Sequence, residues 1–256
     1  LTPIGLLELP QNINQQKHWL RGGYPGALLA KNTVQVNDWI ESFIRSYVER
    51  DLEFLFGVNL SSSTLQKLWS MLAHNNGGIW NAEVFARSLG VTAPTVLRYV
   101  DYLEGGYLIR RLQPWFVNAK KRLIYIRDTG ILHHLLRLDS INEVLGHPVA
   151  GTSWEGYVIE QIYQCKPQYL DMYFYRTHDG AECDVVLVKG IIPVACIEIK
   201  LSNAPVISKG FYTSLEDLKP KKKFVLTPSS DEYPMNDNII VTNLLQFLKK
   251  YLPILK

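Results

Sequence analysis

The chain has 256 residues, 47% hydrophobic and 20% charged, and its 27 basic against 24 acidic side chains give a net charge of +3. This composition is that of a packed globular protein larger than one average domain, and it excludes a disordered chain. The small basic excess permits a polyanionic partner without requiring one.

Three features bear on the compartment. The longest nearly apolar stretch, residues 185–199, carries Lys189 and a Lys-Gly turn signal, so it is too interrupted for the ~20 apolar residues of a membrane span. Three cysteines without CxxC spacing indicate neither a disulfide framework nor a zinc knuckle. Because the start also lacks a basic-then-apolar leader, we expect a cytoplasmic protein with no membrane partner.

The first 58 residues are expected to be helical after an extended lead. Residues 21–26 (Arg-Gly-Gly-Tyr-Pro-Gly) interrupt any helix, because three glycines and a proline fall within six positions. Apolar residues at steps of three to five between 36 and 56 predict an amphipathic helix. Several hydroxyl residues at 61–64 can cap the next helix.

Residues 81–126 predict a winged helix-turn-helix. Asn81 can cap a helix over 82–88, Gly90 makes the turn, and Thr92 can cap a second helix that runs to Glu104. An alternating stretch over 107–112 and a second strand over 122–126 then complete the outline of the motif. Asp128 is expected to cap a further helix.

Such a motif can bind DNA, and its second helix offers Arg98 and Tyr99. We expect the negative charges of Asp101 and Glu104 to offset the positive charge of Arg98. The helix then lacks the excess of basic residues that phosphate contacts require. A structural or partner-docking role for the motif therefore stays open. The residues we single out for nucleic-acid binding are Arg98, Arg110, Arg111, Lys120, Lys121 and Arg122.

From residue 151 the pattern becomes αβββαββα, which predicts an α/β domain of about a hundred residues with a buried mixed sheet. The basic run at 219–223 is expected to be the solvated start of a strand, with a nucleic-acid patch as the alternative. The sequence thus divides into a helical segment (1–58), a winged-helix domain with a linker (59–150) and an α/β domain (151–256).

The strongest chemical signal is Asp184 followed by Glu198-Ile199-Lys200. Two carboxylates can hold Mg²⁺ or Mn²⁺ and an ammonium can position water or phosphate, which is what metal-assisted phosphodiester hydrolysis requires. Glu198 and Lys200 share one face of a strand, and Asp184 joins that face only if the connecting hairpin has an odd turn. Glu155, on the preceding helix, is the expected third metal ligand. The alternative is an ion pair without catalytic function.

The sequences at 178–184 (His-Asp-Gly-Ala-Glu-Cys-Asp) and 197–200 (Ile-Glu-Ile-Lys) resemble the PD-(D/E)xK, restriction-endonuclease-like core. Nearly the whole chain resembles the C-terminal part of a family of prokaryotic AAA+ ATPase-like proteins with an uncharacterised C-terminal domain. This resemblance also rests on Gly-Gly-Tyr-Pro at 22–25, Tyr47 with Arg-Asp-Leu at 50–52, and Asp-Thr-Gly at 128–130. It implies a nuclease-like active-site pattern at Glu155, Asp184, Glu198 and Lys200.

The resemblance further implies that residues 1–58 are the remnant of an AAA+ lid and that ATP binds to an upstream domain. The chain itself contains no GxxxxGK[ST] loop, so we expect no ATPase activity from it. We therefore expect a nucleic-acid-handling region with a Mg²⁺-dependent nuclease site and DNA as its partner; a homo-oligomer is compatible with this. The alternative is a non-catalytic DNA-binding or protein-docking module with a degenerate nuclease fold.

Overall fold

A computed structural model describes residues 2–47, 61–115 and 122–256 of the chain. They form two compact units: Leu1–Arg111 with Leu123–Gly156, and Leu112–Arg122 with Tyr157–Lys256. The three-part division expected from the sequence stays a prediction.

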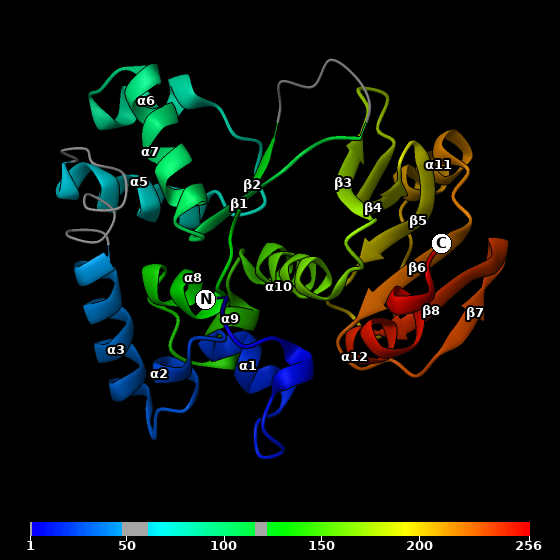
Figure 1. Ribbon diagram of the computed structural model, residues 1–256, viewed down its shortest axis with the longest axis horizontal. Helices are drawn as coiled ribbons and strands as arrows, with labels where there is room; N and C mark the ends of the chain where they lie inside the picture. The colour runs from blue at the N-terminus through cyan, green and yellow to red at the C-terminus, as the bar shows by residue number, and fades with distance from the viewer. Residues whose placement is uncertain (1, 48–60, 116–121) are drawn as a thin grey trace. The chain divides into compact units, whose positions relative to one another are not determined.

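The first unit is helical with a two-stranded sheet (Figure 1). Its elements, two of which (β1 and α10) continue into the second unit, are η1 (Leu6–Glu8), α1 (Gln15–Arg21), α2 (Pro25–Leu28), α3 (Thr33–Ser46), α5 (Ser62–His74), α6 (Ala82–Leu89), α7 (Ala93–Gly105), β1 (Ile109–Leu112), β2 (Leu123–Ile126), α8 (Thr129–Leu135), α9 (Ile141–Gly146) and α10 (Ala150–Cys165).

The predicted caps in this unit are confirmed. The Asn81 side chain accepts hydrogen bonds from the first turn of α6, and Thr92 does the same for α7. Gly90, between the two helices, has φ 67°, a left-handed conformation that favours glycine. Short polar side chains thus satisfy backbone N–H groups that the helices leave without partners, which fixes where each helix begins.

The glycines after α1 are required by close packing against the start of α8. Asp128 caps α8 through Ile131 N (3.0 Å), and its other carboxylate oxygen accepts from Gly23 N (2.8 Å). At Gly22, where φ is +73°, a Cβ would lie 2.0 Å from that carboxylate. A Cβ at Gly130 would lie 2.1 Å from the carbonyl oxygen of Arg21. The Gly-Gly pair and the Asp-Thr-Gly sequence are therefore two halves of one backbone contact.

A buried histidine joins three helices of the same unit. His133 Nδ1 lies 2.9 Å from the carbonyl oxygen of Leu20, to which it must donate, so the neutral ring accepts at Nε2 from Ser153 Oγ (2.7 Å). Ser153 Oγ in turn accepts from Trp19 Nε1 (3.0 Å). Burial lowers the pKa of His133 to about 4, although the bond to Leu20 opposes the shift, and burial likewise lowers the pKa of His18 to about 4.

The second unit is an α/β domain around a mixed six-stranded sheet of order β3-β4-β5-β6-β8-β7. Strands β3, β4 and β5 pair antiparallel, β5, β6 and β8 pair parallel, and β7 returns antiparallel at the edge. The strands are β3 (Asp171–Arg176), β4 (Glu182–Lys189), β5 (Ile192–Ile199), β6 (Lys222–Thr227), β7 (Tyr233–Met235) and β8 (Ile239–Asn243), and the helices are α11 (Lys209–Leu218), η3 (Asn236–Asn238), α12 (Leu244–Gln246), η4 (Phe247–Tyr251) and η5 (Leu252–Ile254).

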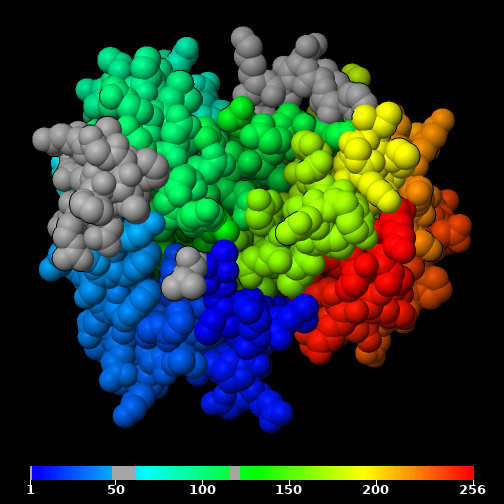
Figure 2. Space-filling model, viewed as in Figure 1, coloured from blue at the N-terminus to red at the C-terminus, as the bar shows by residue number. Residues whose placement is uncertain are grey.

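Helices cover both faces of this sheet. Phe211 and Leu215 of α11 pack on one face with Cys196 and Val225, and on the other face Phe247 meets Phe224 with ring centroids 5.0 Å apart. The end of the chain (red in Figure 2) lies against the segment after α10 (yellow-green), where the Tyr169 hydroxyl donates to Leu255 O (2.9 Å). In the described ranges of both units, no helix is long and apolar enough to cross a bilayer.

The predicted elements of this unit occur in the predicted order, with the unpredicted strand β7 between the last two strands, but the expected odd turn between β4 and β5 is wrong. Lys189 pairs with Ile192, so Gly190 and Ile191 form a two-residue turn, which alone would place Asp184 and Glu198 on opposite faces. Val194 is an extra residue in β5, because Leu187 pairs with Ala195 whereas Val188 pairs with Pro193. This β-bulge shifts the register by one and restores the shared face.

The buried histidines make the stability of the fold depend on pH. Because their pKa values are about 4 when folded and ~6.5 when unfolded, protonation favours the unfolded chain between these values. The free energy of unfolding should thus be highest above pH 6.5 and fall toward pH 4, by on the order of 2–3 kcal/mol per histidine. Urea titrations at several pH values measure this.

The matched variants are His133→Gln, which removes one of the two groups, and His74→Gln at an exposed position. His133→Gln should be less stable at neutral pH and should lose less on acidification than the wild type. His74→Gln should follow the wild type. An unchanged pH dependence in His133→Gln would contradict the role given to this ring.

Candidate functional site

The candidate site lies where β4 begins and β5 ends, beside the start of α11. The pairing of Val185 with Ile197, continued by one residue, places Asp184 opposite Glu198. A second bulge lies at this point, because Asp184 and Val185 together face Phe174 of β3. Bulges of this kind redirect a side chain at the end of a ladder. Asp184 Oδ2 accepts a hydrogen bond from Ile199 N (2.7 Å), so the carboxylate itself closes the end of the hairpin.

Glu198 is the buried centre of the site. The residue is 3% exposed, Lys200 Nζ lies 2.7 Å from its Oε1, and Ser208 Oγ lies 3.5 Å from the same oxygen. Its Oε2 is buried and has no hydrogen-bond partner in the described parts of the chain. Burial raises the pKa of Glu198 above its usual value and the charge of Glu182 adds to this, although Lys200 opposes the shift. A buried carboxylate oxygen without a partner is costly, and a cation would satisfy it.

Lys200 stands beside these acids with its backbone fixed by the sheet. Lys200 lies one residue beyond the end of β5, and its backbone N–H donates to Leu226 O of β6 (2.9 Å). Burial acts to lower the pKa of Lys200, but the hydrogen bond and charge of Glu198, with the charge of Asp184, outweigh it and raise the pKa. The ammonium is therefore charged at neutral pH and is held by the carboxylates around it.

Three contributors to the site were not predicted from the sequence. Ser208 both caps α11, by accepting from Phe211 N (3.1 Å), and reaches Glu198. Its position before an amphipathic helix is a capping signal that could have revealed it. Glu182 pairs with Arg176 and contributes negative charge near Lys200. The backbone N–H of Ile199, which fixes Asp184, carries no side-chain signal in the sequence.

The donor set fits a divalent cation through two carboxylates. In the part of the chain that the structure describes, no group of three His, Cys, Asp or Glu residues could hold a metal ion. Mg²⁺, however, commonly takes one or two protein carboxylates and keeps several waters. Asp184 and Glu198, with the unsatisfied Oε2, meet this requirement.

Glu155, the expected third ligand, belongs to the first unit. There its Oε1 accepts a short hydrogen bond from the Tyr125 hydroxyl, so this carboxylate already has a partner. Its participation in the metal site stays a prediction.

Residues 13–142 match the family model of a domain of unknown function, DUF8612, which covers half of the chain. The chain belongs to this family. Residues 150–247, which contain the candidate site, match a second domain of unknown function, DUF4143.

Two curated relatives of this DUF8612 protein are uncharacterized proteins of Mycobacterium bovis and Mycobacterium tuberculosis. Each is 35% identical to it over 235 residues, which are 90% of this chain and 53% of the relative. The chain thus spans about half the length of the curated relatives that it matches.

The basic residues predicted to bind nucleic acid differ in their exposure and in their ion pairs. Arg98 is exposed on α7, and its expected partners, Asp101 and Glu104, pair instead with Arg111. Arg111 is held by both acids, with 12% of its side chain exposed, which argues against a direct role in binding. Tyr99, also expected to face a groove, is buried. Of the others, Arg110 and Arg122 are half-buried, and Lys120 and Lys121 lie outside the described residues.

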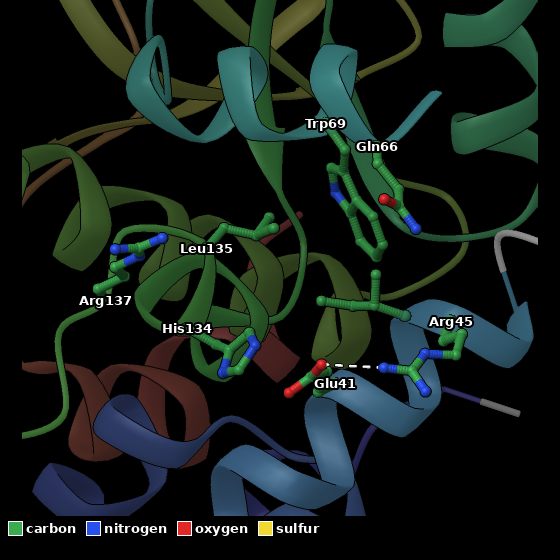
Figure 3. Close-up of a pocket in the computed structure, with 8 residues that line it drawn as sticks. Glu41, Arg45, Gln66, Trp69, His134, Leu135 and Arg137 are labelled. Atoms are coloured by element: carbon green, nitrogen blue, oxygen red, sulfur yellow. Dashed lines mark hydrogen bonds and ion pairs between the residues drawn. The ribbon is translucent and has the colours of Figure 1, made fainter. Parts of the chain in front are cut away.

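A cavity of about 430 Å³ in the first unit is the main rival to this site (Figure 3). Glu41 and Arg45 of α3 form an ion pair (3.1 Å) on one side, and Trp69 of α5 and His134 of α8 line others. The pair is largely exposed and contributes little energy. Among the described lining residues Glu41 is the one carboxylate, so the cavity lacks the paired acids of the sheet site.

Arg111 is expected to matter for stability. Arg111→Ala leaves Glu104 and Asp101 without their cation and should lower the free energy of unfolding by about 2 kcal/mol, less than for a fully buried pair because Asp101 is exposed. Arg98→Ala, which removes an exposed side chain without an ion pair to any described residue, should change it by less than about 0.5 kcal/mol. Urea unfolding compares them; equal stabilities would refute the assignment.

Proposed function

We propose that the chain is the nucleic-acid-handling region of a larger protein and that its second unit is a PD-(D/E)xK-type, Mg²⁺-dependent phosphodiesterase acting on DNA. The observation that carries the proposal is the buried Glu198 carboxylate opposite Asp184: one oxygen contacts Lys200, and the other has no partner among the described residues. Such an arrangement is costly in a hydrophobic sheet unless a bound cation uses it.

Each residue has a chemical role in this proposal. Asp184 and Glu198 would hold the cation, and Mn²⁺ could replace Mg²⁺. When bound, the cation would offset charge on the phosphate and favour ionisation of a water molecule. Lys200, at the end of the same strand, positions the water or a phosphate oxygen. Ser208 orients Glu198 from the first turn of α11.

The rest of the chain has a supporting role in the same proposal. We assign α6, α7, β1 and β2 to a winged helix whose exposed Arg98 contacts DNA. Because the relatives are about twice as long as their matching part, an upstream AAA+ domain that binds ATP is consistent with the comparison. The cytoplasm is the expected compartment. A homo-oligomer is compatible with the proposed function.

The nuclease activity is tested with purified protein, Mg²⁺ or Mn²⁺, and plasmid or single-stranded DNA. We expect metal-dependent cleavage that Asp184→Asn and Glu198→Gln each reduce by at least about 100-fold, because each removes one charge from the cation's ligands. Glu216→Gln, at an exposed position of α11, is the matched control and should cleave normally. Cleavage that survives both substitutions would refute the assigned site.

Lys200→Met separates metal binding from catalysis. The ammonium contacts the same carboxylate that would hold the cation, so its removal should raise Mn²⁺ affinity by about tenfold while cleavage falls. Titration calorimetry measures the affinity without a substrate. If Lys200→Met and the wild type bind Mn²⁺ equally, the two cations do not share Glu198.

One observation favours a second function. The Lys200–Glu198 pair already neutralises one charge, and no third metal-binding side chain joins the two acids among the described residues. A degenerate nuclease fold that docks DNA or a partner protein without cutting would have the same arrangement of Asp184, Glu198 and Lys200. Absence of both cleavage and Mn²⁺ binding in the assays above would select this alternative.

A further inference from the structure

The second unit carries a groove whose described lining is basic and contains no acid. It has a volume of about 450 Å³ and is lined by Lys221, Lys222, Lys223, Pro234, Asn238 and Ile240. These residues come from the start of β6 and the residue before it, the edge strand β7, the end of η3 and the start of β8; the three strands are neighbours in the sheet (Figure 1).

The groove lies apart from the candidate active site. Ile240 pairs with Phe224 on one side and with Pro234 on the other, so all three belong to the sheet face that carries Phe224, and alternation places Lys222 there too. Glu198 pairs with Val225, whose side chain lies on the α11 face. Lys222, Pro234 and Ile240 therefore lie on the face opposite Glu198, whereas Lys223 alternates to the α11 face at the start of β6, and its Nζ reaches Asp237 O.

The positive charge of the protein is concentrated in this region. Residues 219–256 contain seven lysines, no arginine and three acidic residues, a net charge of +4, whereas the whole chain carries +3. One of those acids, Glu232, is neutralised by Lys250 (2.8 Å). The remaining 218 residues therefore have a net charge of −1, and the basic excess of the chain resides here.

Backbone contacts hold two of the lysines at the groove. Lys223 Nζ donates to Asp237 O (3.0 Å) and Lys221 Nζ donates to Lys256 O (3.1 Å). Each ammonium keeps further N–H donors, since it has three. Lys222 is exposed, and its side chain makes no hydrogen bond or ion pair with any described residue. The three lysines thus line one groove together with the apolar side chains of Pro234 and Ile240.

We infer that this groove binds the phosphate backbone of a nucleic acid. Lysines act as point charges that suit phosphates without reading sequence. An acidic peptide is a poorer fit, because an extended peptide would pair with the edge strand β7, where Pro234 has no N–H to donate. The choice of nucleic acid among polyanions rests on the proposed function, whereas the basic groove itself does not.

The test measures binding of the full chain to a labelled 30-nucleotide DNA, single- or double-stranded, by fluorescence anisotropy. EDTA is present, so metal binding and cleavage do not contribute. In the triple variant Lys221→Gln/Lys222→Gln/Lys223→Gln we expect at least about tenfold weaker binding at 50 mM salt. The slope of log affinity against log salt should decrease in magnitude by about 0.9 for each lost phosphate contact on duplex DNA.

Controls separate the groove from folding and from general charge. Lys17→Gln/Lys31→Gln/Lys67→Gln removes the same charge from the first unit and should bind almost as the wild type does. Lys222→Gln alone disturbs no contact with a described residue and should give part of the effect even if the triple variant unfolds. Because EDTA removes any divalent cation, the assay does not depend on the proposed metal site, so failure of the nuclease proposal is distinguishable from failure of this one.

Two results would overturn the inference. Wild-type affinity and salt slope in both the triple and the single groove variants would show that nucleic acid binds elsewhere. Poly-glutamate that competes with DNA at equal charge concentration, and no longer binds the triple variant, would identify an acidic polypeptide as the occupant.

Discussion

The burial of a carboxylate within a hydrophobic sheet is the constraint on which the second unit depends. Glu198 lies between Ile197 and Ile199 in a strand that has partners on both sides, and it is 3% exposed. An anion in such a place requires compensation. Lys200 provides part of it through one oxygen, and Ser208 lies within reach of the same oxygen. The second oxygen lacks such a partner among the described residues. The protein therefore leaves one buried acceptor unsatisfied, which a bound cation would satisfy.

Two irregularities of the sheet place the acids together. The extra residue Val194 in β5 changes which residues face each other across the hairpin, and the bulge at Asp184 and Val185 lies near the start of β4. Pro193 is tolerated in an interior strand because it lies next to the first bulge, where a regular ladder bond is not required. Without this one-residue shift, Asp184 would face away from Glu198 and the acids could not act on one ligand.

In the first unit, buried polar side chains join segments that are distant in sequence. Asp128 binds the loop after α1, and Ser153 joins Trp19 to His133. All of these groups are buried, and each bond satisfies a donor or acceptor that would otherwise be unpaired. The Gly-Gly pair at 22–23 is thus explained by packing, since a side chain at Gly22 would collide with Asp128.

The sequence alone determined the elements and much of the chemistry, because caps, glycines and apolar periodicity are local signals. It predicted α6, α7, the order of the second unit apart from β7, and the position of Glu198 in a strand; Lys200, expected in the same strand, lies one residue beyond it. The short edge strand β7 was missed because Pro234 interrupts its pattern. Tertiary structure decided the face of Asp184, the partners of Arg111 and the convergence of three lysines on one groove. These depend on strand register and long-range packing, which one residue more or less in a strand can reverse.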